Sequence, residues 1–275
     1  MTYLDALILG LIQGLTEFLP VSSSGHLVIA KAIFGVETSG ASLEVLVHLA
    51  TVCSVLTMIR GTLRDRIVPG IRLLFQALGR RVGWGAAWEQ ESFRLVALIV
   101  WGTVPGAVAG LLLGEHLDRV FSDPRMALMF LLVTGVVLQL SRIRPVSERP
   151  LGFASGTLVG LAQAVAVFPG ISRSGMTITM GLARGLNPKL AAEFSFLLLI
   201  PVVLGAGLVS FLRPGETGMG DLPVGPAILG FLAAYISGCL AVWLIMKHIR
   251  KGMLHRYSYY CWAIGCGGLV LLQVM

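Results

Sequence analysis

The chain has 275 residues, of which 56% are hydrophobic and only 13% are charged. This charged fraction is about half of the usual ~25%, which excludes a disordered chain, an ordinary soluble domain and a nucleic-acid-binding arm. The 21 Lys and Arg outnumber the 14 Asp and Glu to give a net charge of +7. The basic residues lie between long apolar runs, a pattern typical of the loops that orient a membrane protein.

We expect no cleavable signal peptide, because the first basic residue is Lys31 and the charged start of such a peptide is missing. The cysteines all lie in apolar segments without metal-ligand spacing, so we expect packed thiols rather than disulfides. They are Cys53, Cys239, Cys261 and Cys266.

Apolar segments of about 20 residues predict membrane-spanning helices. Six segments fit this description, and the third is the shortest; they cover residues 43–59, 94–114, 126–141, 190–212, 224–246 and 256–275. We therefore predict an all-α polytopic membrane protein that forms one membrane domain over residues 1–275.

Two further apolar regions are interrupted and do not fit a simple span. Residues 4–35 are broken at Pro20 and the Ser22–Gly25 stretch, and residues 152–185 are broken at Pro169 and the Ser172–Gly175 stretch. Broken backbone at membrane depth is tolerated only where protein or a water-filled cavity surrounds it. Both regions therefore predict re-entrant helix hairpins.

The interruptions recur at a nearly constant offset along the chain. Ser22 and Ser172 are 150 positions apart, and so are Gln13 and Gln163. Each half, about 1–150 and 151–275, then holds one hairpin and three spans. Because three is odd, the second half is expected to be inverted, with a site where the two breaks meet.

The basic loops predict the orientation. The loops 60–93, 142–151 and 247–256 are rich in Arg and Lys, so we expect them on the cytoplasmic side, with 115–125 and 213–223 outside. Both termini then fall outside, and the hairpins enter from opposite faces.

The first break combines polar groups that are expensive to bury in a bilayer. Gln13 and Glu17 share one helix face, Ser22 is a candidate helix cap, and Ser23 and His26 are spaced to project together from the next helix. The free N–H groups of a helix start suit an anion.

The second break adds an arginine at another helix start. The Arg173 guanidinium matches phosphate oxygens, and Ser172, Ser174 and Thr177 offer hydroxyls nearby. Together with the first break, this set suits phosphoryl transfer. Glu17 would have to be protonated, act as a base, or hold a divalent cation.

Structural interpretations remain open for several residues. Arg173 can instead pair with Glu17 or Glu193. For Glu44 and Glu193, structural pairing or a role in supporting the site residues is at least as good an interpretation as catalysis. We interpret His48 as a hydrogen-bonded core histidine. Small residues elsewhere predict helix packing rather than chemistry; they are Ser155, Gly156, Ser195, Ser210 and Ser237.

At these motifs the sequence closely resembles the undecaprenyl-diphosphate phosphatase family, also called the bacitracin-resistance membrane proteins. The first motif runs from Gln13 to His26 as QGLTEFLPVSSSGH, and the second from Pro169 to Thr177 as PGISRSGMT. A third stretch, EFSFLL, begins at Glu193. The likeness runs the whole length of the chain.

The resemblance implies hydrolysis of a C55 polyprenyl diphosphate to the monophosphate carrier lipid and phosphate. It implies Ser23 as the nucleophile, Glu17 and His26 as acid or base groups, and Arg173 as the diphosphate holder. It further implies Mg²⁺ or Ca²⁺, held by Glu17 and, as a neutral ligand, Gln13. The remaining expected diphosphate-binding residues are Ser22, Ser24, Ser172, Ser174 and Thr177.

The implied location is the bacterial inner membrane, with the site open to its outer face. Expected partners are the polyprenyl diphosphate and membrane lipids but no nucleic acid, and a homodimer is left open. Direct attack by water, with Ser23 only binding phosphate, also stays open. The alternative function is a secondary transporter or lipid flippase, since paired broken helices are common in transporters. Such a protein would need no nucleophile.

Overall fold

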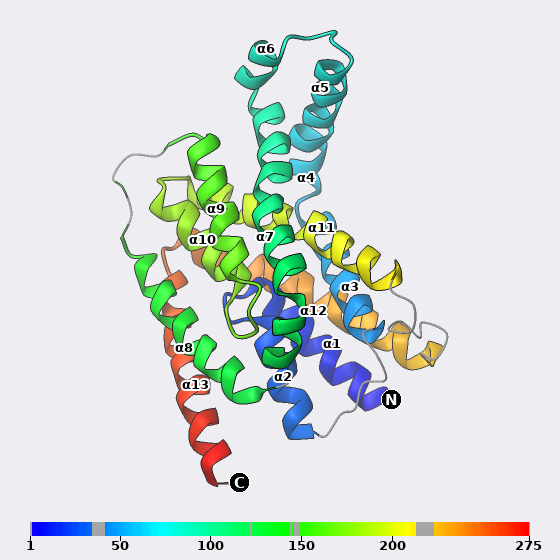
Figure 1. The fold of residues 1–275 in the computed structure, drawn as a ribbon, viewed down its shortest axis with the longest axis vertical. Helices are drawn as coiled ribbons and strands as arrows, with labels where there is room; N and C mark the ends of the chain where they lie inside the picture. The colour runs from blue at the N-terminus through cyan, green and yellow to red at the C-terminus, as the bar shows by residue number, and fades with distance from the viewer. Residues whose placement is uncertain are drawn as a thin grey trace.

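The computed structural model describes residues 2–34, 42–121, 123–143, 145, 149–212 and 223–274. Throughout these ranges the regular elements are helices (Figure 1), which confirms the all-α prediction. They are α1 (Tyr3–Phe18), α2 (Ser23–Phe34), α3 (Ser42–Met58), α4 (Arg60–Thr62), the π-helical turn Leu63–Ile67, α5 (Val68–Leu78), α6 (Trp84–Glu89), α7 (Glu91–Phe121), α8 (Pro124–Leu140), α9 (Phe153–Val165), α10 (Arg173–Ala183), α11 (Pro188–Leu212), α12 (Val224–Arg250), the 3-10 turn Leu254–Arg256 and α13 (Tyr257–Val274).

Both expected interruptions are present. α1 ends at Phe18 just before Pro20, and α2 begins at Ser23. In the second region α9 ends at Val165 and α10 begins at Arg173, with Pro169 in the gap. Proline cannot supply an N–H to a continuing helix and disfavours helical backbone in the residue before it, so both helices stop there.

Three of the described helices, α7, α11 and α12, are long and apolar enough to cross a membrane. A fourth span is added if α3 and the helical segment Arg60–Leu78 are taken as one span bent by 72°. The protein is therefore a multi-pass membrane protein. α8 and α9 are apolar but shorter, so the count of six spans stays a prediction.

The 60–93 segment is not the plain loop that its basic residues suggested. It forms a helical arm in which α5 and α6 pack against the start of α7 (Figure 1). Buried Ala77, Ala87 and Phe93 form a small core of their own, with the Trp84 and Trp88 rings edge-on to Phe93. The basic residues alone predict a loop, whereas the apolar side chains between them pack together and let the segment fold as helices.

A long helix of each half of the chain packs against helices of the other half. In one set α1 and α3 pack on α12, and in the other α9 and α11 pack on α7. α8 and α13 lie side by side along one edge of the molecule (Figure 1). The largest core cluster includes Phe18, Phe194 and Phe196, which places it directly beside the first break.

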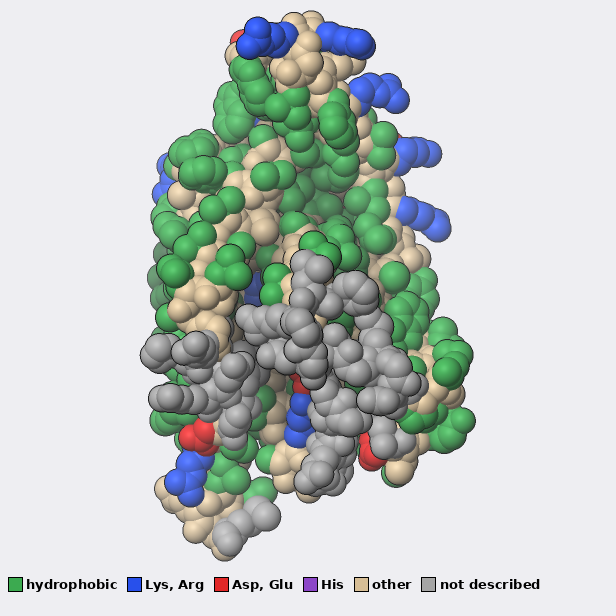
Figure 2. Space-filling view, turned by 45° about the vertical axis from the view of Figure 1, so that its right-hand side comes forward, with side chains coloured by type: hydrophobic (Ala, Val, Ile, Leu, Met, Phe, Trp, Pro, Cys, Tyr) green, Lys and Arg blue, Asp and Glu red, His purple; other side chains and the backbone are tan. Residues whose placement is uncertain are grey.

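The surface carries large apolar side chains on the flanks and basic ones on the arm. Figure 2 shows hydrophobic side chains over the flanks and Lys and Arg side chains at the tip and one edge of the arm. The start of α1 and the end of α13 lie at the end of the molecule opposite α5 and α6 (Figure 1). Loop 213–223 lies almost entirely outside the described residues, as do Arg144 and part of the 142–151 loop.

Candidate active site

Ser22 joins the two helix breaks. Its backbone adopts φ 68°, and its Oγ accepts hydrogen bonds from Gly25 N–H at 3.3 Å and from Gly170 N–H at 3.0 Å. The first of these bonds caps α2, as the sequence suggested. The second crosses to the other half of the chain, so the breaks meet as expected.

The second break is shaped by Gly170 and Ser172. Gly170 has φ 97°, and a Cβ there would collide with the carbonyl oxygen of Ala127, so the position requires glycine. Ser172 caps α10 by accepting from Gly175 N–H at 3.1 Å. The Thr134 hydroxyl donates to the Gly170 carbonyl at 2.7 Å. These contacts fix where Arg173, the first residue of α10, begins.

Glu17 lies where the two breaks meet, with only 7% of its surface exposed. Its Oε2 accepts from the Ser23 hydroxyl at 2.6 Å and from Gln13 Nε2 at 2.9 Å. Its Oε1 accepts from Arg173 at 2.7 Å. A buried carboxylate is stable only when paired and hydrogen-bonded, and three side chains here meet that need.

Arg173 is held by groups from both halves of the chain. One terminal nitrogen donates to Glu17, and the other donates to the Ser195 carbonyl at 3.3 Å. The Ser195 hydroxyl lies 2.6 Å from Thr177 Oγ1. The sequence pattern assigned Ser195 to packing alone, and its backbone carbonyl left no signal in the sequence. The remaining N–H donors of the guanidinium are available to a ligand.

The hydroxyls at the breaks divide into two groups by burial. Ser23 and Ser24 are half-buried. The nearby Arg173 side chain is 14% exposed. Almost fully buried, by contrast, are Ser22, Ser172, Ser174 and Thr177. Their hydrogen bonds go to protein groups, as when Ser174 donates to the Leu19 carbonyl at 3.3 Å. Their diphosphate-binding role stays a prediction, while their contacts show that they hold the breaks in shape.

His26 turns toward α13 instead of making a hydrogen bond to Glu17 or Ser23. Its Nδ1 lies 2.8 Å from the Ser22 carbonyl, which can only accept, so Nδ1 carries the proton. Its Nε2 lies 2.9 Å from the Tyr260 hydroxyl, and the two rings stack. His26 is thus held at the edge of the site by Ser22 and Tyr260.

His48 lies closer to the carboxylate than the sequence suggested. Its Nδ1 donates to the Glu44 carbonyl at 2.6 Å, which aims Nε2 at Glu17 Oε2, 3.9 Å away. From the sequence we interpret His48 as a hydrogen-bonded core histidine. A signal for a functional role was available in the sequence, because ionisable residues inside a membrane are functional candidates by default.

The other two acidic candidates are engaged in structural pairs. Glu44 forms an ion pair with Lys31. Glu193 accepts from the Thr62 hydroxyl at 2.9 Å and lies 3.6 Å from Lys189 Nζ. The pairing interpretation is confirmed for both residues.

All four cysteines carry free thiols.

A divalent cation fits Gln13 and Glu17 in one specific respect. Gln13 is fully buried, yet its Oε1 has no hydrogen-bond partner and is adjacent to the amide nitrogen that contacts Glu17. Among the described residues no group of three His, Cys, Asp or Glu side chains could enclose a metal. One carboxylate and one amide oxygen suit a cation that takes its other ligands from substrate phosphates and water.

The helices and the site define a class: a polytopic membrane protein with a serine, a carboxylate and an arginine at the meeting point of two broken helices. The chain belongs to the family described as bacitracin resistance protein BacA, whose pattern matches residues 6–267. It is 42% identical to an undecaprenyl-diphosphatase of Salinibacter ruber over 99% of this chain and 100% of the relative. Undecaprenyl-diphosphatases of Carboxydothermus hydrogenoformans and Methanosphaera stadtmanae are 40% and 36% identical, covering 98% and 99% of both chains.

Proposed function

We propose that this chain hydrolyses undecaprenyl diphosphate to undecaprenyl phosphate and inorganic phosphate. The carrying observation is the 2.6 Å hydrogen bond from Ser23 to Glu17, with Arg173 on the other oxygen of the same carboxylate. This arrangement joins a nucleophile, a proton acceptor and a phosphate-binding cation in one buried place. The names of the relatives, matched over nearly their whole length, support the substrate.

In the proposed reaction Ser23 Oγ attacks the terminal phosphorus while its proton passes to Glu17 Oε2. The bond between that phosphorus and the bridging oxygen breaks, and the lipid monophosphate leaves with the bonding electrons. Its second pKa is about 6, so it departs readily as an anion. Glu17 passes its proton to the departing lipid phosphate and is again a carboxylate. Water then attacks the phosphoserine and gives a proton to Glu17, which returns it to the Ser23 oxygen as that oxygen leaves phosphorus and phosphate is released.

Arg173 and the two helix starts stabilise the charge that builds on the terminal phosphoryl oxygens. The first N–H groups of α2 and α10 have no partners within their own helices. Both helices begin at the site, at Ser23 and Arg173. A Mg²⁺ or Ca²⁺ ion held by Glu17 and Gln13 Oε1 would neutralise part of the diphosphate charge.

We further propose six spans and two re-entrant hairpins related as an inverted repeat. The packing of helices from one half on a long helix of the other half supports this arrangement: α1 and α3 pack on α12, and α9 and α11 pack on α7. The basic arm would face the cytoplasm of a bacterial cell, and the site would open to the outer face of the inner membrane. The product would re-enter use as the carrier lipid for envelope polymers, and removal of the diphosphate would confer bacitracin resistance.

Phosphate release tests the proposal directly. Purified protein in detergent is given undecaprenyl diphosphate with Mg²⁺, with Ca²⁺ or with EDTA. We expect release of inorganic phosphate with a cation and loss of release in EDTA. If no phosphate appears with any cation, although the lipid binds, the chain is a lipid carrier rather than a hydrolase.

A further inference from the structure

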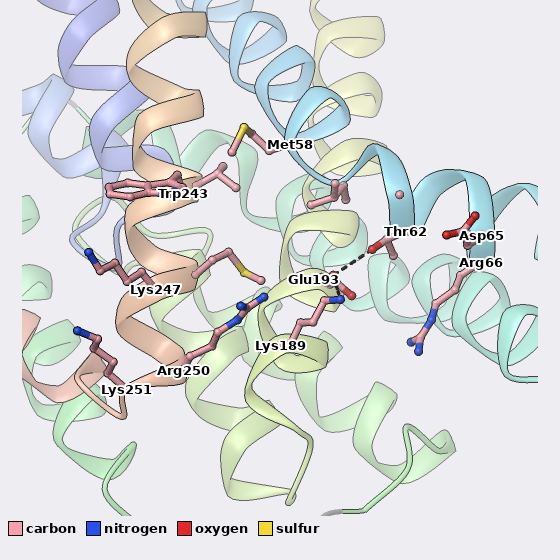
Figure 3. Close-up of a pocket in the computed structure, with 14 residues that line it drawn as sticks. Met58, Thr62, Asp65, Arg66, Lys189, Glu193, Trp243, Lys247, Arg250 and Lys251 are labelled. Atoms are coloured by element: carbon pink, nitrogen blue, oxygen red, sulfur yellow. Dashed lines mark hydrogen bonds and ion pairs between the residues drawn. The ribbon is translucent and has the colours of Figure 1, made fainter.

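A cavity of about 720 Å³ lies between the bend after α3, the start of α11 and the end of α12. Its lining contains none of the residues around Glu17. Figure 3 shows the Arg250 side chain extending from α12 toward the start of α11, where Lys189 lies beside Glu193 and Glu193 is joined to Thr62. The cavity is therefore separate from the candidate active site.

Cations dominate the lining of this cavity. The lining contains five basic residues and two acidic ones, namely Arg66, Lys189, Lys247, Arg250 and Lys251 against Asp65 and Glu193. Both carboxylates are already engaged, Glu193 with Thr62 and Lys189, and Asp65 with Arg64. Within the described part of the chain, no carboxylate lies within 4.0 Å of the basic groups of Lys247, Arg250 or Lys251. These three cations are free to bind an anion.

The cavity also has an apolar side that continues onto the flank of the molecule. Met58 and Trp243 line it and are 39% and 52% exposed. Lys247 Nζ lies 5.1 Å from the centre of the Trp243 ring, a contact that favours a cation beside an aromatic face. A ligand with an anionic head and an apolar body would match both sides of the cavity.

The cavity lies where α3 and α12 change from apolar to basic residues. The apolar run of α3 ends at Met58 just before Arg60, and α12 turns basic at Lys247. The orientation rule requires only that basic residues lie on this side and does not require them to line a hollow. Basic pockets between membrane helices are characteristic of lipid headgroup sites.

We propose that this cavity binds the phosphate headgroup of an anionic phospholipid from the leaflet on the basic side. Arg250, Lys247 and Lys251 would contact the phosphate, with Arg250 able to bind two oxygens at once. Met58 and Trp243 would contact the glycerol and the upper acyl chains. The site would anchor the protein to its surrounding lipid without taking part in hydrolysis.

Native mass spectrometry of the purified full chain tests this site. The protein is titrated with dioleoylphosphatidylglycerol or with dioleoylphosphatidylcholine, and bound lipid is counted. The pocket variant carries Lys247→Gln, Arg250→Gln and Lys251→Gln. The control carries Arg72→Gln, Arg80→Gln and Arg81→Gln, which removes the same charge from exposed positions of the arm that do not line the cavity.

We expect wild type and control to bind phosphatidylglycerol more tightly than phosphatidylcholine. The pocket variant should lose this preference, with affinity falling roughly five-fold for each removed cation. Melting temperature and hydrolysis in detergent should match wild type, and the single variant Arg250→Glu should also lower the affinity for phosphatidylglycerol, by a smaller factor than the triple variant. Unchanged phosphatidylglycerol binding in the folded pocket variant would overturn the proposal. Displacement of bound phosphatidylglycerol by millimolar inorganic phosphate would also overturn it, since the cavity would then recognise a free anion rather than a lipid.

Discussion

The Ser23 hydroxyl donates to Glu17 Oε2 across 2.6 Å, although the two residues lie in different helices separated by a break at Pro20. The short contact exists because α1 ends before the break and α2 starts immediately after it. A continuous helix would point residues six apart to different faces. The break is therefore what brings together the proposed nucleophile and its proposed proton acceptor.

The ion pair between Arg173 and Glu17 predicts different outcomes for two substitutions. Arg173→Ala leaves a buried carboxylate unpaired, so we expect a loss of about 3–5 kcal/mol in the free energy of unfolding as well as loss of activity. Arg173→Lys keeps the charge but loses the planar fork, so we expect a folded protein with phosphate release reduced about 100-fold or more. Thermal unfolding and phosphate release measure the two effects.

The double variant Glu17→Gln with Arg173→Ala serves as the control for the stability effect. It removes the unpaired charge and should recover most of the lost stability while staying inactive. An Arg173→Ala protein as stable as wild type would show that the pair is not buried as described.

The unpartnered Oε1 of Gln13 predicts how the cation requirement responds to substitution. Gln13→Glu adds a second carboxylate beside Glu17, so half-maximal activity should need less Mg²⁺, because affinity rises with ligand charge. Gln13→Leu should need more. Titration of phosphate release against Mg²⁺ after EDTA treatment gives both values, with Gln163→Leu as the matched variant in the other half. Identical Mg²⁺ curves for all four proteins would exclude Gln13 as a ligand.

His48 Nε2 faces Glu17 Oε2 at 3.9 Å, which predicts a positioning role. We expect His48→Gln to lower kcat about 10- to 100-fold with little change in KM. His255→Gln, at a histidine that contacts the Gly252 carbonyl instead, should leave both kcat and KM near wild type. A His48→Gln protein with wild-type kcat would reduce His48 to a packing residue.

Gly170 predicts a strong dependence of the second break on one small residue. Gly170→Ala would place a methyl group against the Ala127 carbonyl and strain a backbone with φ 97°. We expect a loss of about 2–4 kcal/mol in unfolding free energy and reduced activity, because Arg173 would shift. Gly205→Ala, in α11 where a Cβ meets no atom within 4 Å, should stay within about 1 kcal/mol of wild type. Equal melting temperatures for the two variants would contradict this account of the break.

The sequence predicted the breaks and singled out Glu17 and Arg173 because both signals are local, although it left Glu17 and Glu193 open as partners of Arg173. Pro20 and Pro169 stop helices wherever they occur, and Glu17 and Arg173 are charges in apolar segments, where burial demands a partner. Ser22 as a cap follows from the same local rules.

Other features depend on contacts between distant segments of the chain. The carbonyl of Ser195 holds Arg173 only because α11 packs against α10. His48 reaches Glu17 because α3 packs on α1, and His26 turns away because Tyr260 of α13 is its neighbour. The helices of the 60–93 arm likewise depend on packing around Phe93.

The most direct test of the account compares phosphate release from undecaprenyl diphosphate by wild type, Ser23→Ala and Ser24→Ala. Both serines are half-buried at the start of α2, but only Ser23 is bonded to Glu17, whereas the Ser24 hydroxyl lies 3.4 Å from that of Ser22. We predict that Ser23→Ala lowers kcat about 10³-fold or more and that Ser24→Ala stays within about tenfold of wild type. A folded Ser23→Ala protein with near-normal turnover would contradict the assignment of Ser23 as the nucleophile.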